Sequence, residues 1–268
     1  MHPCQERSAS SVPYQSSSTT REPTSAAGVW PAGSIGPSCT GGARRADRGA
    51  ASAVRAVRDT GPMSPTTGLL LAAGEGRRYG MPKALVADSE GPWVHRAARA
   101  LLDGGCQDVL VVTGARAEEV EQLLGQMPEW GTGQVAAVRC GTWARGMGAS
   151  LRSGLTSLAT RGRTVPRRAV VHLVDLPDVG APVVERLLRE ADAHGEQTGQ
   201  VARAAYEGRP GHPVVLGQRH WEGVLGGAAG DAGARSYLRR VEPLLVECGD
   251  LATGEDVDEP RSGTAALT

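Results

Sequence analysis

A glycine-punctuated loop that carries three cations is the stretch of this chain most suited to chemistry. An apolar run that ends at Ala73 leads into Gly74-Glu75-Gly76-Arg77-Arg78-Tyr79-Gly80-Met81-Pro82-Lys83. Its glycines can adopt φ > 0 and let backbone N–H groups approach an anion. Two arginines and a lysine add positive charge at the same place. A buried strand that feeds such a loop is typical of a phosphate-binding site.

Lys83 is the only lysine in the chain, and every other one of the 29 basic residues is arginine. A compact ammonium on a flexible stem can follow a phosphate through a reaction, whereas a planar guanidinium cannot do so in the same space. The survival of one lysine therefore indicates a contact with a phosphate group.

Asp175 is a second candidate for chemistry. It follows the apolar run Val170-Val171-His172-Leu173-Val174, which reads as a buried strand. Its carboxylate should lie at the sheet edge where the glycine loop lies. A carboxylate beside a triphosphate is repulsive unless a cation separates them, and Mg²⁺ binds through one or two carboxylates plus substrate phosphates. The alternative role for Asp175 is a helix cap, for which Asp178 is better placed.

The sequence around these residues alternates between strand and helix patterns. Strands are expected at 68–72, 108–113, 134–139, 168–174, 200–206, 213–216 and 243–247, and helices at 92–102, 117–124, 147–159, 182–194, 220–225 and 231–241. This alternation predicts a doubly wound α/β domain with a mostly parallel sheet that binds ligands at the carboxyl ends of its strands. Gly146 would open the helix at 147–159, whose first turn carries Ser150, so free N–H groups would face that edge.

Residues 1–62 are rich in Ser, Ala, Gly, Pro, Thr and Arg and show no apolar periodicity. We expect a disordered tail, or a start of translation at Met63, followed by one domain over 63–268. The zero net charge and 3% aromatic content argue against a nucleic-acid partner. No apolar run approaches ~20 residues, so no membrane span is expected. Five dispersed cysteines favour reduced thiols and a cytoplasmic location.

The glycine loop with its Pro-Lys ending resembles the motif of the MobA-like nucleotidyltransferases, Leu-Ala-Ala-Gly-x-Gly-x-Arg-Met-Gly-x-Pro-Lys. Tyr79 stands where that family usually has Met. Further resemblances follow in family order: Trp143-Ala144-Arg145-Gly146-Met147-Gly148-Ala149-Ser150-Leu151, Asp175-Leu176-Pro177, Gly208-Arg209-Pro210-Gly211-His212-Pro213, Gly230-Asp231-Ala232-Gly233-Ala234-Arg235 and Asp256-Val257-Asp258. After Asp258, Glu259 and Arg261-Ser262 depart from the family's Thr-Pro-Glu-Asp ending.

The resemblance implies roles for individual residues. Lys83, Arg78 and Asp175 would be catalytic, and Asp175 and Asp258 would hold Mg²⁺. The nucleotide would lie against Leu71, Ala72, Ala73, Gly74, Gly76, Arg77, Gly80, Thr113, Gly146 and Ser150. The acceptor would contact Arg209, Gly211, His212, Asp231 and Arg235.

The implied activity is transfer of a nucleotidyl group from a nucleoside triphosphate to a phosphorylated acceptor, with release of pyrophosphate. Ala73 resembles the cytidylyl branch, which transfers CMP to a molybdopterin-type cofactor and would bring a molybdoenzyme or its chaperone as a partner. Guanylyl or sugar-phosphate transfer on the same fold is an alternative. The spacing Gly74-x-Gly76-x-x-x-Gly80 leaves open an NAD(P)-dependent reductase, although Thr113-Gly114 stands where a ribose-binding acid or Arg is expected. A non-catalytic maturation factor is a third possibility.

Overall fold

The structure, a computed structural model, describes residues 66–161, 165–227, 233–259 and 265–266. These residues belong to a compact unit that spans Arg58–Thr268. The predicted tail at residues 1–62 lies outside the described residues.

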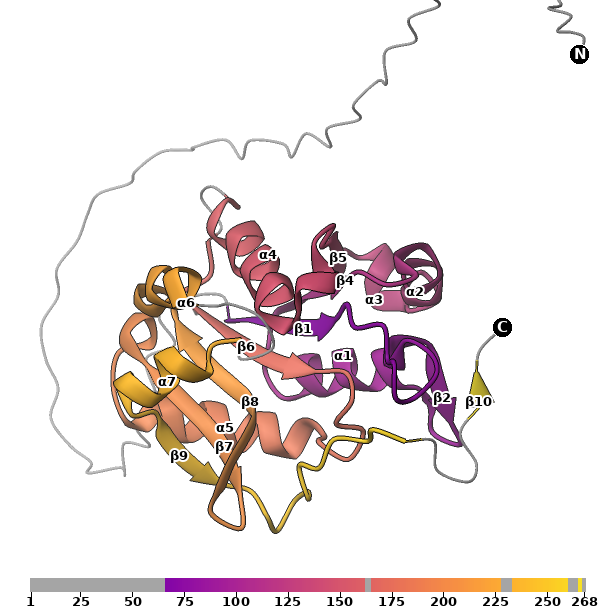
Figure 1. Cartoon of the computed structure of the whole chain (residues 1–268). Helices are drawn as coiled ribbons and strands as arrows, with labels where there is room; N and C mark the ends of the chain where they lie inside the picture. The colour runs from indigo at the N-terminus through magenta and orange to yellow at the C-terminus, as the bar shows by residue number, and fades with distance from the viewer. Residues whose placement is uncertain (1–65, 162–164, 228–232, 260–264, 267–268) are drawn as a thin grey trace, which may run out of the picture. The chain divides into compact units, whose positions relative to one another are not determined.

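A seven-stranded sheet in the order β5-β4-β1-β6-β8-β7-β9 forms the centre of the domain (Figure 1). Its strands are β1 (Thr66–Ala72), β4 (Asp108–Thr113), β5 (Val135–Arg139), β6 (Arg168–Leu173), β7 (Val201–Tyr206), β8 (Arg209–Gly217) and β9 (Leu244–Glu247). The four strands from β5 to β6 are parallel, and β8 runs antiparallel to both of its neighbours. The predicted α/β fold with a mostly parallel sheet is confirmed.

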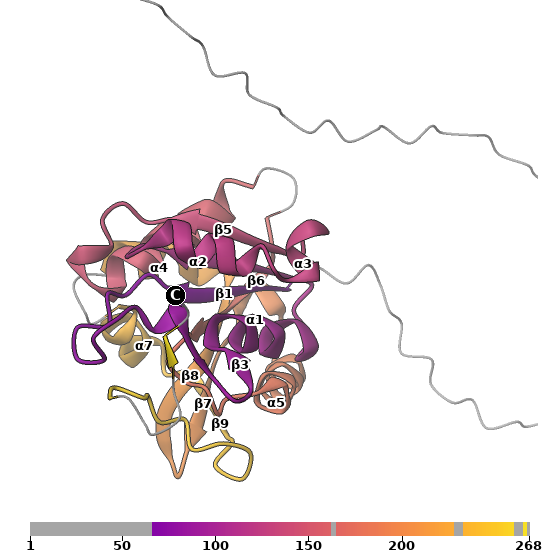
Figure 2. The ribbon, with the colours of Figure 1, turned by 90° about the vertical axis from the view of Figure 1, so that its right-hand side faces the viewer.

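Helices cover both faces of the sheet (Figures 1 and 2). One face packs against α1 (Trp93–Asp103), α2 (Ala117–Leu124) and α5 (Ala181–Ala193), and the other packs against α4 (Met147–Ala159), α6 (Trp221–Gly227) and α7 (Arg235–Val241). β1 is buried over its whole length, as a strand covered on both faces must be. Alternate β1 residues feed the two cores: Leu70 and Ala72 enter the first, and Leu69 and Leu71 the second.

Several short elements extend the predicted pattern. A 3₁₀ turn, η1 (Lys83–Leu85), follows the glycine loop and leads into the hairpin of β2 (Val86–Asp88) and β3 (Gly91–Pro92). A short helix, α3 (Pro128–Gly131), precedes β5, and β10 (Ala265–Ala266) pairs with β2. Among the described residues, no helix has both the length and the apolar character that a membrane crossing requires.

Candidate functional site

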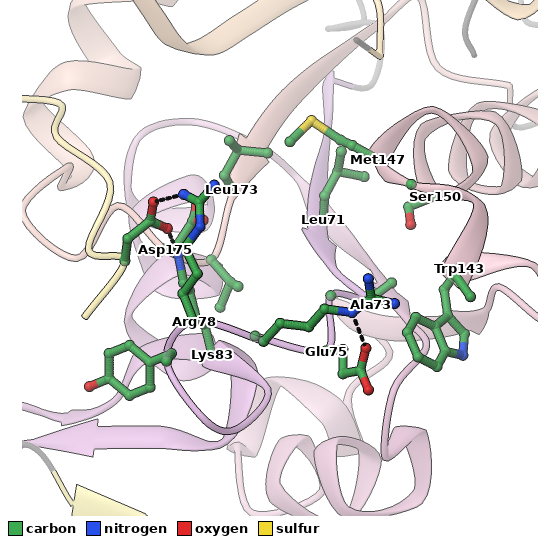
Figure 3. A pocket seen from close by; sticks show the side chains of 18 of the residues that line it. Leu71, Ala73, Glu75, Arg78, Lys83, Trp143, Met147, Ser150, Leu173 and Asp175 are labelled. Carbon is green, nitrogen blue, oxygen red and sulfur yellow. Dashed lines mark hydrogen bonds and ion pairs between the residues drawn. The ribbon is translucent and has the colours of Figure 1, made fainter. Parts of the chain in front are cut away.

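A cavity of about 510 Å³ opens at the carboxyl ends of β1 and β6 (Figure 3). We call it the first cavity. Arg78, Lys83 and Asp175 lie on one side of it, and Trp143, Met147 and Ser150 lie on the other. Leu71, Ala73 and Leu173 lie between the two groups. One wall therefore carries an ion-pair cluster, and Leu71, Ala73 and Leu173 give the surface beside it an apolar character, with the Arg77–Glu75 ion pair also in the lining.

The glycine loop forms the rim of this cavity. Gly76 and Gly80 have φ values of +66° and +87°, and Gly80 N–H donates to Gly76 O over 2.8 Å. A Cβ at Gly76 would lie 1.8 Å from Met81 O, so the loop can close only around a glycine. Gly74 does not have positive φ, and a Cβ there would meet nothing within 4 Å. Its surroundings leave room for a ligand to approach the backbone.

Lys83 joins the two predicted metal ligands. Its Nζ donates to Asp258 Oδ1 over 2.7 Å and to Asp175 Oδ2 over 3.1 Å. Arg78 Nη1 donates to the other oxygen of Asp258 over 2.8 Å. The second oxygen of Asp175, Oδ1, is buried without a partner among the described residues. Residues 180 positions apart in the sequence thus form one charged cluster, and it contains the residues for which the family resemblance implied catalytic and metal-binding roles.

The electrostatics of this cluster favour the charged forms of Lys83 and Asp258. Burial alone would lower the pKa of Lys83, but the hydrogen bonds and charges of Asp258 and Asp175 outweigh it, and the pKa is raised. The hydrogen bond and charge of Lys83 lower the pKa of Asp258. An ammonium between two carboxylates is therefore a stable arrangement before any substrate arrives.

A folded-back segment brings Asp258 to this cluster. Val257 N–H donates to Asp175 O over 3.0 Å, which lays the segment beside the Asp175 loop. Asp178 Oδ2 accepts hydrogen bonds from Thr253 N and Thr253 Oγ1, at 2.7 and 2.6 Å. Asp178 is not the cap of α5, which has Gly180 as its N-cap and no side-chain cap bond. Asp178, which the sequence suggested as a helix cap, instead anchors the segment that carries Asp258.

The helix α4 begins at the opposite wall. Its N-cap, Gly146, has φ +98°, a value that favours glycine, and Ser150 in the first turn is buried against the cavity. Trp143, in the short turn η2 (Trp143–Arg145), also lines the cavity. A Cβ on Gly114 would lie 2.7 Å from Ala73 O and Trp143 Cβ, so Gly114 allows the two walls to close together.

A second cavity of about 300 Å³ adjoins the first. Both are lined by Leu71, Met147, Leu173 and Asp175. The predicted acceptor residues Gly211, His212 and Arg235 line it, together with Arg203 of β7. Arg203 Nε donates to Gly211 O over 2.7 Å, and no described carboxylate pairs with Arg203 or Arg235.

This second cavity is electropositive at its polar end. Burial lowers the pKa of Arg203, and the neighbouring charge of Arg235 lowers it further. Burial, followed by the charges of Arg203, His172 and Arg235, lowers the pKa of His212 to about 3. His212 is therefore neutral at physiological pH, so the positive charge at this end comes from the two guanidinium groups, while Asp175 and Asp256 also line the cavity.

Some predicted contacts fall outside both cavities. Ala72, Gly80, Thr113 and Arg209 do not line either one. Thr113 is fully buried and donates to Glu121 Oε1 over 3.2 Å, and Arg209 is exposed at the start of β8. Asp231 lies outside the described residues.

Arg203 was missed by the sequence analysis. The signal available was a lone guanidinium inside the apolar strand Val201-Ala202-Arg203-Ala204-Ala205-Tyr206. A charge in such a strand requires either a partner or a ligand.

Comparison with known proteins extends these observations. Residues 68–244 match the MobA-like NTP transferase domain. The nicotine blue oxidoreductase of Paenarthrobacter nicotinovorans is 36% identical over 202 residues, which cover 72% of this chain and 91% of that protein.

Solved structures share the fold at lower identity. A nucleotidyl transferase from Methanothermobacter thermautotroptrophicus is 22% identical with a TM-score of 0.58, covering 73% of this chain and 92% of that one. Rv0371c from Mycobacterium tuberculosis H37Rv is also 22% identical, with a TM-score of 0.57 and coverage of 73% and 94%. A further structure of Rv0371c, a complex with manganese, has a TM-score of 0.51 at 22% identity and covers 69% of this chain and 88% of that one. With two thirds of its length matched by the domain family, the chain belongs to the MobA-like NTP transferases.

Proposed function

We propose that this protein is a Mg²⁺-dependent nucleotidyltransferase that moves CMP from CTP to a phosphorylated acceptor. The observation that carries the proposal is the convergence of Lys83, Arg78, Asp175 and Asp258 at one wall of the first cavity. Cations for a triphosphate and carboxylates for a metal are the two sets of groups that this reaction requires.

The two carboxylates fit a magnesium site. Asp175 Oδ1 is buried and unpartnered among the described residues, which is a cost that a cation would relieve. The described residues contain no group of three or more His, Cys, Asp or Glu side chains that could hold a metal alone. Mg²⁺ is commonly bound by one or two carboxylates plus substrate phosphates, so the nucleotide would supply the remaining ligands. A structure of Rv0371c in complex with manganese supports divalent metal use on this fold.

The proposed reaction is a single displacement. An oxygen of the acceptor phosphate attacks the α-phosphorus of CTP, the bond from that phosphorus to the bridging oxygen breaks, and pyrophosphate leaves. Lys83 and Arg78 would stabilise the charge that develops on the leaving phosphates, and the metal would supply further neutralisation. Positioning and charge stabilisation suffice, because no covalent enzyme intermediate is needed.

The second cavity is the proposed acceptor site. It adjoins the first cavity at Asp175, so an acceptor there could reach the α-phosphate. Arg203 and Arg235 would bind an anionic group, while Leu71, Leu151 and Leu216 would pack against the flat face of a ring system. A molybdopterin-type cofactor has this combination, and a molybdoenzyme or its chaperone is the corresponding partner. We also propose a cytoplasmic location, which the dispersed, buried free cysteines Cys106, Cys140 and Cys248 favour.

The identity of the nucleotide rests on a small feature. Ala73 is buried and lines the first cavity. It is the residue at which this chain resembles the cytidylyl branch of the family. Guanylyl transfer would need a larger base to lie in the same space.

A second candidate function is reduction of an organic substrate by a nicotinamide dinucleotide. The observation in its favour is the 36% identity to a nicotine blue oxidoreductase. Under this reading, the glycine loop would bind the pyrophosphate of NAD(P)H.

Calorimetric titration with CTP, GTP and NADPH, each with and without Mg²⁺, separates the candidates. We expect CTP to bind tightly only with Mg²⁺, and Asp175→Asn to abolish that metal dependence. The same variant should lower turnover by ~10²-fold or more, as loss of one electrostatic contributor does. Mg²⁺-independent binding of NADPH together with no response to either triphosphate would instead establish the reductase reading.

A further inference from the structure

A layer of hydrogen bonds behind the first cavity joins the two loops that carry its charges. We propose that Asp88 is a positioning residue, which fixes the glycine loop and the Asp175 loop relative to each other through Trp93 and Arg96. The inference rests on the proposed function for its catalytic meaning, since the loops it joins carry the proposed metal and phosphate ligands.

The first arm of this layer reaches the glycine loop. Trp93 Nε1 donates to Asp88 Oδ2 over 2.9 Å. The Trp93 ring packs edge-to-face on Tyr79, with ring centroids 5.7 Å apart and an interplanar angle of 65°. Both aromatic rings are buried, and Tyr79 lies between Arg78 and Gly80 of the loop. Fixing the indole therefore fixes the apolar side of the loop that carries Arg78.

The second arm reaches the Asp175 loop. Arg96 Nη1 donates to both carboxylate oxygens of Asp88, over 2.7 and 2.8 Å. Arg96 Nη2 donates to Pro177 O, two residues after Asp175. Pro177 has no N–H, so its carbonyl is its only backbone group that can form a hydrogen bond. The contact with Arg96 therefore directly restrains the position of the Asp175 loop.

The chain itself supplies a third arm. Asp88 ends β2, which follows η1 without a gap, and η1 begins at Lys83. One carboxylate thus lies at the junction of the three segments that supply Arg78, Lys83 and Asp175. Only about a fifth of the side chains of Asp88 and Arg96 is exposed, so solvent weakens this pair less than a surface ion pair. The precision gained matters, because a misplacement of ~1 Å in a site can cost ~10²-fold in rate.

The simpler role for Asp88 is to shape its own hairpin. Asp88 Oδ1 also accepts a hydrogen bond from Glu90 N–H over 2.9 Å, which stabilises the turn between β2 and β3. A residue with only this role would affect thermal stability and the hairpin, without changing the two remote loops.

Asp88→Asn and Arg96→Gln test the inference, with Arg186→Gln as the matched control. Arg186 has the same pattern of partners away from the site: it bonds the Asp250 carboxylate over 2.8 Å and the Glu247 carbonyl over 3.1 Å. Hydrogen exchange of the ligand-free, full-length protein is the primary measurement. We expect both test variants to speed amide exchange at 74–83 and at 175–178 by about tenfold, as loss of a few local contacts does. The control should leave both segments unchanged.

Calorimetry with CTP gives the second measurement. The expected result is that Asp88→Asn reduces, by about tenfold, the factor by which Mg²⁺ increases CTP affinity. CTP affinity without metal should stay within about threefold of wild type, since the opposite wall of the first cavity, with Trp143, Met147 and Ser150, is not part of this layer. Arg96→Lys keeps the charge but lacks the planar fork, so its Mg²⁺ effect on CTP affinity should lie between those of Arg96→Gln and the wild type.

The outcomes separate the two claims. Unchanged exchange at both loops in Asp88→Asn, or faster exchange confined to residues 86–92, would overturn the positioning role whatever the protein binds. A wild-type protein that binds no nucleoside triphosphate would overturn the proposed function, while the exchange result would still decide the positioning role.

Discussion

At the scale of single residues, Lys83 explains why the cluster survives without a ligand. Its side chain is only 12% exposed, and its ammonium contacts two carboxylates that would otherwise repel each other. Under the proposed function, the same ammonium would contact the leaving phosphates once the triphosphate and its metal are bound. One flexible cation can therefore serve both states, which a guanidinium with a fixed planar fork would do poorly.

The substitution Lys83→Arg tests this role. The charge is kept, but the larger planar group would displace a phosphate by about an ångström, so we expect kcat/KM for CTP-dependent pyrophosphate release to fall by ~10²-fold. Lys83→Ala should be no more active. Arg186→Lys, a conservative exchange remote from both cavities, is the control and should keep wild-type activity. Near wild-type turnover in Lys83→Arg would remove the chemical reason for the single lysine.

At this scale, the sequence is most informative for residues whose role follows from their own charge and chemistry. Lys83 and Asp175 could be placed at this sheet edge because their charge and their position after a strand define them, whereas Asp258 was indicated only by the family resemblance. Arg203 and Asp88 could not, because their importance comes from contacts with Gly211, Trp93 and Arg96 that only the folded chain makes. A lone arginine in a strand and an aspartate in a hairpin have many ordinary explanations.

At the scale of elements, the glycines of the glycine loop have different structural roles. Gly76 is required by backbone geometry, whereas Gly74 has neither positive φ nor a close neighbour. Gly76→Ala should therefore lower the free energy of unfolding by ~1–3 kcal/mol, the usual cost of a strained backbone position. Gly74→Ala should leave the melting temperature unchanged and weaken CTP binding, because its Cβ would enter the space at the cavity rim.

Thermal denaturation and calorimetry on the two variants provide the measurement. Equal melting temperatures for Gly76→Ala and Gly74→Ala would contradict the assigned difference. Unchanged CTP affinity in Gly74→Ala would exclude close approach of the ligand at that point.

The elements also show where a pattern of apolar residues stops being informative. The parallel strands and main helices were predicted within a few residues, since each has a clear periodicity. The extension of β8 back to Arg209 was missed. Glu207 and Gly208 both have positive φ and form the two-residue turn of a hairpin, which makes β8 antiparallel to β7. Turn conformation, rather than hydrophobicity, sets that boundary.

At the scale of the whole molecule, a buried histidine in the central sheet does not fit its surroundings. His172 is fully buried in β6, and neither ring nitrogen has a hydrogen-bond partner among the described residues. Such an imidazole costs stability even when neutral, because its desolvated polar atoms receive nothing in return. Burial also lowers the pKa of His172 to about 4.

This histidine should make stability depend on pH in a defined window. The unfolded chain binds a proton near pH 6.5, whereas folded His172 resists it until about pH 4. The unfolded state therefore holds more protons within this window, so stability falls as pH is lowered from about 6.5 to about 4. For His172 alone the loss is on the order of 3 kcal/mol. His212, with a pKa lowered to about 3, contributes in the same direction.

The substitution His172→Leu separates the two effects. Leucine has a similar volume and no polar atoms, so we expect the free energy of unfolding at pH 7 to rise by ~1 kcal/mol or more. The free energy of unfolding should then fall less steeply between pH 6.5 and 4, because His172 no longer contributes to the pH dependence. The contribution of His212 should remain. Urea denaturation of wild type and variant at half-unit pH intervals measures both quantities. Parallel stability curves for the two proteins would mean that His172 has a partner in solution and titrates normally, because only a buried, unpaired imidazole produces a difference in slope.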